Sequence, residues 1–203
     1  MVIATLRVAL LLLLVGPGSA WAERGGAVES WIEGRLLVAT DQLDDPKFAE
    51  SVVYMVAHGP EGAFGLIVNR RLAVGPLGRL MESMGRPAPE RSEWEIAVYD
   101  GGPVAREVAM MLHGEDYATE ATFDAGPGLR LTPAEAALEA IGRGEGPQSG
   151  LLIVGHAGWA PGQLEQEIAE GAWTLVDADP RFVLDPEVED KWRRALAREG
   201  QDL

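Results

Sequence analysis

The sequence predicts an α+β fold, with a mixed, largely antiparallel central sheet or partial barrel flanked by helices. Two observations carry this prediction. Two apolar, β-branched runs, 51–58 and 63–69, are separated by a short turn containing glycine and proline, which is typical of a β-hairpin. Segments with helical spacing also occur, but they do not alternate strictly with strands as a doubly wound parallel sheet requires.

Other strand-like runs account for the rest of the expected sheet. They are short, apolar and bounded by glycine or polar residues, which favours buried strands. The expected strands outside the hairpin are 35–40, 95–99, 108–112, 150–154 and 173–176, the last of them at a sheet edge. The side chains expected in the core are Leu37, Val53, Met55, Leu66, Val68, Leu152, Val154, Leu164, Ile168 and Trp192.

Apolar spacing predicts helices over 76–84 and 163–170, and a last helix that starts at Asp185-Pro186. A further helix is expected to start at Thr132, whose hydroxyl would cap it while Glu135 closes a capping box. Glycines after about residue 141 are expected to end that helix.

Residues 1–22 have the layout of a secretory signal peptide. Arg7 supplies a positive charge, 8–15 is unbroken apolar sequence, and Ala20-Trp21-Ala22 presents small residues for cleavage after Ala22. We therefore expect a periplasmic or secreted protein. The alternatives are an uncleaved anchor, for which the apolar run is short, and a cytoplasmic protein whose true start lies near Glu29.

The remainder is expected to contain an exposed lead-in over 23–33, a single domain over 34–198 and a tail over 199–203. The chain carries 17 Lys and Arg against 32 Asp and Glu, so its net charge of −15 opposes direct nucleic-acid binding. We interpret Arg70-Arg71 and the cations of 191–198 as solvated faces. No membrane span is expected after signal cleavage. The absence of cysteine excludes disulfides and thiol chemistry.

Three glycine-bearing segments, 62–70, 100–103 and 155–159, follow or end apolar runs. Glycine permits positive φ and close backbone approach, so we expect tight turns that converge on one sheet edge. Asn69 is expected to clamp a local loop, or else to bind a ligand carbonyl; Trp159 is expected to be a core residue, or else to lie at a pocket mouth. The candidate ligand- or partner-binding residues are His58, Asn69, Gly101, Gly102, Pro103, His156, Gly158 and Trp159.

Histidine offers the alternative function, a hydrolase with His58 or His156 as general base beside Asp100 or Glu165. Histidines at strand ends more often bond nearby backbone, and no recognisable nucleophile motif accompanies these. Neither a His-x-x-x-His pair nor an Asp-rich loop occurs. We therefore expect no catalytic residue, no metal and no cofactor.

In order along the chain, these motifs resemble the YqgE/AlgH family. The resemblance includes Asp45-Pro46-Lys47-Phe48 and 162–167, and it covers roughly 34–196. It implies an α+β fold and a small soluble bacterial protein of undefined biochemical activity; one branch has a name linked to regulation of alginate production. Members usually look cytosolic and some carry cysteine, so this chain departs from them in its leader and in lacking thiols.

Residues and resemblance together favour a non-enzymatic binding or regulatory protein, acting on an unknown protein or small-molecule partner through the glycine segments. The hydrolase remains the alternative.

Overall fold

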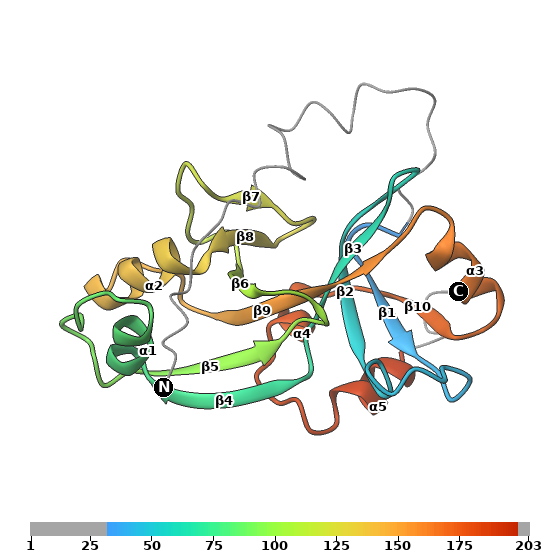
Figure 1. Cartoon of the computed structure of the whole chain (residues 1–203), viewed down its shortest axis with the longest axis horizontal. Helices are drawn as coiled ribbons and strands as arrows, with labels where there is room; N and C mark the ends of the chain where they lie inside the picture. Colours follow the sequence, from blue (N-terminus) through green and yellow to red (C-terminus); the bar gives the residue numbers. More distant parts are fainter. Residues whose placement is uncertain (1–31, 199–203) are drawn as a thin grey trace, which may run out of the picture.

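The computed structural model describes residues 32–198. A ten-stranded, mainly antiparallel sheet curls through the molecule, with α1 (Leu77–Ser83) and α2 (Ala134–Arg143) at one end and α3 (Gln163–Ala169) at the other (Figure 1). This confirms the expected α+β fold. The predicted signal peptide, most of the predicted lead-in and the predicted tail lie outside the described residues.

Most of the sheet follows the order β10-β1-β2-β3-β9-β6-β8-β7, and β5 joins β4 to β9 beside this path. The strands are β1 (Arg35–Ala39), β2 (Val52–Gly59), β3 (Gly62–Ile67), β4 (Arg71–Pro76), β5 (Glu95–Asp100), β6 (Val104–His113), β7 (Phe123–Asp124), β8 (Arg130–Pro133), β9 (Gly150–Trp159) and β10 (Trp173–Asp177). The β2–β3 hairpin and the edge position of β10 agree with the predictions. The short β4, β7 and β8 were not predicted.

Strand β9 holds the two ends of the sheet together. Its first half pairs with β5 in parallel and with β6 in antiparallel orientation, while residues 157–159 pair with β3. Gly155 separates these halves at φ +70°, a conformation that glycine adopts without strain. The expected strand over 150–154 is therefore only half of the one observed.

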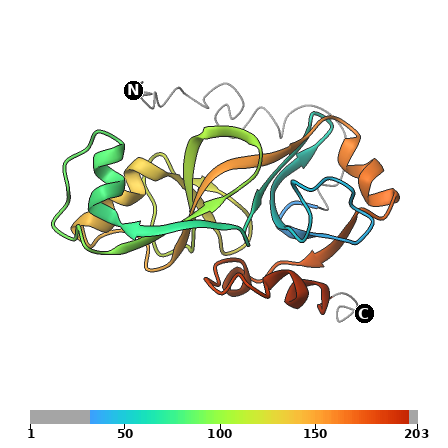
Figure 2. The same cartoon turned by 60° about the horizontal axis from the view of Figure 1, so that its bottom comes forward.

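The C-terminal helices lie beneath the sheet, on the side that comes forward in Figure 2. They are α4 (Pro180–Val183) and α5 (Lys191–Leu196). The prediction that a helix starts at Asp185 is wrong, because the chain between these helices is not helical.

The predicted capping box is also wrong. Thr132 belongs to β8, and α2 begins at Ala134 without a side-chain cap. The Thr132 hydroxyl is instead buried and hydrogen-bonded to His113 and Thr122. Helix α2 ends before Gly144, whose φ of +79° agrees with the predicted glycine stop.

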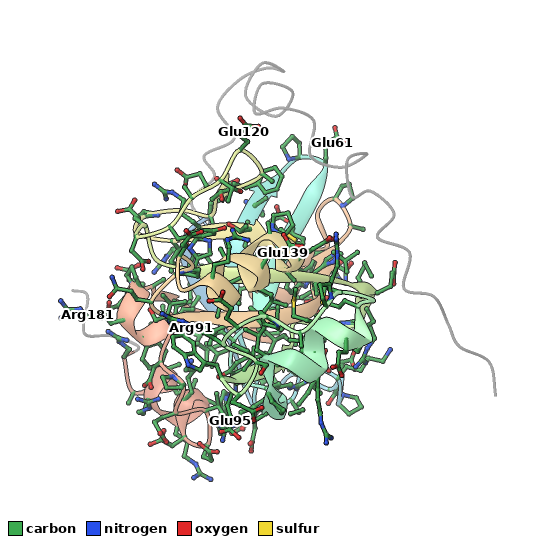
Figure 3. All side chains as sticks on the ribbon, turned by 90° about the vertical axis from the view of Figure 1, so that its left-hand side faces the viewer. Glu61, Arg91, Glu95, Glu120, Glu139 and Arg181 are labelled. Atoms are coloured by element: carbon green, nitrogen blue, oxygen red, sulfur yellow. The ribbon has the colours of Figure 1, made fainter. Side chains whose placement is uncertain are left out.

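Three apolar clusters fill the molecule. Seven of the ten expected core residues are buried, whereas Val154, Ile168 and Trp192 are half-buried. Ile32 is buried too, which corrects the end of the lead-in predicted to be exposed. Charged side chains project outward around this core, among them Glu61 at the hairpin tip and Glu120 (Figure 3).

Candidate functional site

The second and third glycine segments meet in the structure. A Cβ atom on Gly101 would lie 2.3 Å from the carbonyl oxygen of Gly155, and one on Gly102 would lie 2.3 Å from the carbonyl of His156. Gly102 also has φ +140°, so a side chain is excluded there by conformation and by space. The Gly-Gly pair thus lets the end of β5 pack directly on the middle of β9.

The first glycine segment reaches the same place through β3. Phe64 pairs with Gly158 across the β3–β9 ladder, and its ring lies 4.7 Å from the His156 ring between centroids. Val104 pairs with His156 from β6 and is 42% exposed. We call the group Phe64, Pro103, Val104, His156 and Gly158 the junction surface. The three segments therefore meet, but they do so on β9 in the interior of the sheet and not at the sheet edge that the sequence predicted.

The third segment is not a turn, which corrects that expectation. Residues 155–159 lie inside β9, where they pair with β3 and β6. The irregular backbone lies opposite, where the β6–β9 register shifts between Val104 and Ala109. Ala105 has φ +48° within this bulge, an uncommon conformation for a residue with a side chain. Sequence reasoning missed Phe64 and Val104, although both belong to or adjoin the quoted segments.

The pleat separates the predicted site residues onto two faces of the sheet. Alternate residues of a strand point to opposite faces. His58, Ala63 and Trp159 form one row across β2, β3 and β9, whereas Phe64 and Gly158 belong to the next row. His58 and Trp159 are accordingly buried toward α3 and do not belong to the junction surface.

His58 is held by a carboxylate. Its Nε2 atom lies 2.9 Å from Oε1 of Glu165 on α3, and its side chain is 2% exposed. Its Nδ1 atom is buried and has no hydrogen-bond partner among residues 32–198. A general base needs a nitrogen that a substrate can reach. The free Nδ1 atom of His58 is buried, so this geometry opposes a role for His58 as a general base.

Trp159 is a core residue and does not lie at a pocket mouth, which confirms the first of the two predictions made for it. Its indole Nε1 donates to Oε2 of Glu167, which also accepts from Nε1 of Trp173. The two indoles meet edge to face at 5.9 Å, and Phe48 lies against both. One carboxylate of α3 thus satisfies two buried indole donors.

His113 and His156 differ in their surroundings. His113 is buried, with Nδ1 2.7 Å from the Gly114 carbonyl and Nε2 2.8 Å from the Thr132 hydroxyl. Because the carbonyl can only accept, Nδ1 carries the proton and Nε2 accepts from Thr132 in the neutral ring. Burial lowers the pKa of His113 and also that of His156. The junction surface therefore presents an uncharged imidazole at neutral pH.

Asn69 clamps a local loop, as predicted. Its Oδ1 accepts from the backbone N–H of Val52 and its Nδ2 donates to the carbonyl of Glu50. It also lines a pocket of about 650 Å³. The other lining residues are Ala49, Glu50, Arg70, Arg71, Leu72, Asp100, Val188, Glu189, Trp192 and Arg193. None of the other predicted site residues lines this pocket.

Of the basic residues interpreted as solvated, Lys191 is buried and Arg70 is half-buried. Lys191 is fully buried, and its Nζ atom donates to the carbonyls of Val68, Val183 and Asp185. Burial lowers its pKa to about 8. Arg70 donates to carbonyls of the β1–β2 loop. Both cations therefore fasten backbone segments together.

Within residues 32–198, no helix is long and apolar enough to cross a membrane. The same part of the chain contains no group of three His, Asp or Glu side chains arranged to hold a metal ion.

The fold and its glycine-packed junction define a small α+β protein with a curled, mainly antiparallel sheet. A family described as AlgH-like matches residues 36–203, so the chain belongs to the AlgH-like family and the resemblance is confirmed. A UPF0301 protein of Methylococcus capsulatus is 42% identical over 170 residues, which cover 84% of this chain and 92% of the relative. One from Afipia carboxidovorans is 39% identical over 86% of each chain.

Two solved structures share the fold. The solution structure of the AlgH protein from Pseudomonas aeruginosa has a TM-score of 0.72 and 32% identity, and the match covers 87% of this chain and 93% of that one. A crystal structure from Corynebacterium diphtheriae has a TM-score of 0.66 and 25% identity, with coverages of 89% and 91%. The family's function is uncharacterised.

Proposed function

We propose that this chain is a non-enzymatic binding or regulatory protein whose partner contacts the junction surface. The convergence of three distant glycine segments on that surface is the observation that supports the proposal. Their backbones meet with no side chain between them, which leaves Val104 exposed beside His156 and Phe64. Because burial lowers the pKa of His156, the partner group is expected to be apolar and uncharged.

Site-specific photo-crosslinking in the native host tests this proposal. A photoreactive amino acid at Val104 is expected to give one discrete adduct with a partner. An unlabelled competitor protein that carries Val104→Asp should not reduce the amount of this adduct, because it no longer binds the partner. The same label at Arg181, which points outward elsewhere on the molecule (Figure 3), is the control. Identical adducts from both positions would refute a specific partner at the junction.

The hydrolase alternative is supported by the His58–Glu165 contact at 2.9 Å. It is opposed by the burial of the other imidazole nitrogen. Hydrolysis of a panel of small esters by the purified chain, lost in His58→Gln and His156→Gln, would establish it. We expect no hydrolysis that depends on either histidine.

We also propose export with cleavage after Ala22, which rests on the sequence pattern alone. N-terminal sequencing of protein made in a native-like bacterial host tests it. A product that still starts at Met1, or one that starts near Glu29, contradicts it.

A further inference from the structure

Strand β4 has an exposed apolar edge. It pairs with β5 alone within the described sheet, so its other edge has no neighbouring strand. Leu72 is 51% exposed and Val74 is 50% exposed. Natural sheets usually protect such edges with charged side chains, proline or bulges. Here Pro76 and a register shift after Arg71 limit the edge, but Leu72, Ala73 and Val74 remain apolar and exposed.

The pocket described above begins where this edge begins. Arg71 and Leu72 belong to both features, and Val188 and Trp192 add apolar lining from the other side of the pocket. Its volume of about 650 Å³ is within the range of ligand-binding pockets. The edge and the pocket therefore form one continuous surface, which we call the β4 groove. It is separate from the junction surface.

Most charges that line the pocket already have partners. Arg71 is paired with Glu189, and Asp100 accepts from the Gly102 N–H. Within residues 32–198, the guanidinium of Arg193 and the carboxylate of Glu50 have neither an ion pair nor a hydrogen bond. Arg193 is thus a cation free to bind a carboxylate, in a chain whose net charge is −15.

Strand polarity indicates which carboxylate fits. A peptide that extends the sheet antiparallel to β4 runs from Pro76 toward Arg71, so its C-terminal end arrives at the pocket. Its backbone groups would bond the free edge, and its alternate side chains would lie beside Leu72 and Val74. A parallel peptide would place its C terminus at the opposite end of β4, away from Arg193.

A second copy of this chain fits the groove less well. Antiparallel self-pairing about Val74 sets Pro76, which has no N–H, opposite Leu72 of the other copy and so removes a hydrogen bond. Two chains of net charge −15 also repel each other. We propose that the β4 groove binds the extended, apolar C-terminal segment of another protein, with its terminal carboxylate at Arg193.

A synthetic peptide, acetyl-Thr-Val-Thr-Val-Thr-Val with a free carboxylate, tests this proposal by NMR titration of the isotope-labelled chain. Amide shifts are expected at residues 71–76 and around the pocket. The C-terminal amide of the same peptide is expected to bind about tenfold more weakly, the loss of one charge-assisted contact. Arg193→Gln should abolish the difference between acid and amide, while Glu50→Gln should strengthen binding of the acid.

Val74→Lys is expected to weaken both peptides by about tenfold or more. Phe123→Lys, at an exposed apolar residue outside both the groove and the junction surface, is the matched control and should change neither. Thermal melting checks that each variant is folded. The proposal is overturned if the free acid produces no shifts at millimolar concentration, if the shifts lie elsewhere, or if acid and amide bind equally. A concentration-dependent dimer that Val74→Lys dissociates would assign the groove to a second copy instead.

Discussion

Helices α2 and α3 lie at opposite ends of the molecule and are held by different chemistry (Figure 1). Helix α2 packs through an apolar face that buries Ala134, Ala137, Leu138, Ala140, Ile141 and Gly142. Helix α3 buries only Leu164, and its carboxylates Glu165 and Glu167 bind His58 and two tryptophans. A two-turn helix with little apolar surface can thus be fixed by hydrogen bonds from a carboxylate to buried donors.

The largest expected effect is on the apolar side of this comparison. Leu138→Ala should lower the free energy of unfolding by about 2–5 kcal/mol, because it leaves a cavity under α2. Ile168→Ala on α3 removes a half-buried side chain and should cost less than half as much. Urea denaturation measures both. Equal losses would show that the two helices do not differ in this way.

The second-largest effect is expected when the hydrogen bonds between α3 and the two buried tryptophans are removed. Glu167→Ala leaves the buried indole N–H groups of Trp159 and Trp173 unpaired, which should cost about 1–3 kcal/mol. Glu170→Ala is the matched control, because within residues 32–198 that exposed carboxylate accepts only from Gln166. This variant should change stability by about 0.5 kcal/mol at most. A Glu167→Ala protein as stable as this control would contradict the proposed role of the carboxylate.

A smaller effect is expected on the pH dependence of stability, through His113 at the α2 end of the molecule. His113 is hydrogen-bonded to a hydroxyl, whereas His58 at the α3 end is hydrogen-bonded to a carboxylate. Burial holds the pKa of His113 below its ordinary value, so the unfolded chain binds a proton more readily than the folded one. The stability that this group contributes is present above about pH 6.5, the pKa of the unfolded chain, and is lost as the pH falls below that value through the lower pKa of the folded state.

Melting temperatures between pH 7.5 and pH 5 measure this loss. His113→Gln should reduce the pH dependence without abolishing it, because burial also lowers the pKa of His156. An unchanged pH dependence in the variant would exclude His113 as its source.

The smallest effect is expected on the outer surface of α2, where Glu135 pairs with Arg86. Glu135→Gln should change the free energy of unfolding by about 1 kcal/mol or less, because both side chains are partly exposed to water. Added salt should reduce the difference further. A large, salt-independent loss would mean that carboxylates hold α2 as well as α3.

The hairpin and the meeting of the glycine segments could be predicted because short signals determine them, but the place where the segments meet, inside the sheet and not at its edge, could not. Residues 51–58 and 63–69 are apolar and β-branched around a glycine turn, and glycine pairs favour close backbone approach. Strand β4 could not be predicted in this way, because its sequence does not alternate between apolar and polar residues and most of its side chains are exposed. Thr132 has the sequence of a helix cap, yet tertiary contacts with His113 engage its hydroxyl instead.

The face that His58 occupies could not be predicted either. Tyr54 and Val56 point into one apolar cluster, and strict alternation would place His58 there too. The β2–β3 register shifts between Met55 and Ala57, so His58 instead pairs with Ala63 on the α3 side. A bulge of this kind reverses the direction of each later side chain, and its position follows from packing against β9 and α3 rather than from local sequence.

Strand β9 has a consequence for how the chain is made. It is the only described strand that joins the two ends of the sheet, and it begins at Gly150. During synthesis β3, β5 and β6, which all pair with β9, therefore each have an unpaired edge until the last quarter of the chain has left the ribosome. Such non-local pairing slows folding and exposes strand edges to aggregation. Fragments that stop before residue 150 are expected to depend on chaperones or be degraded.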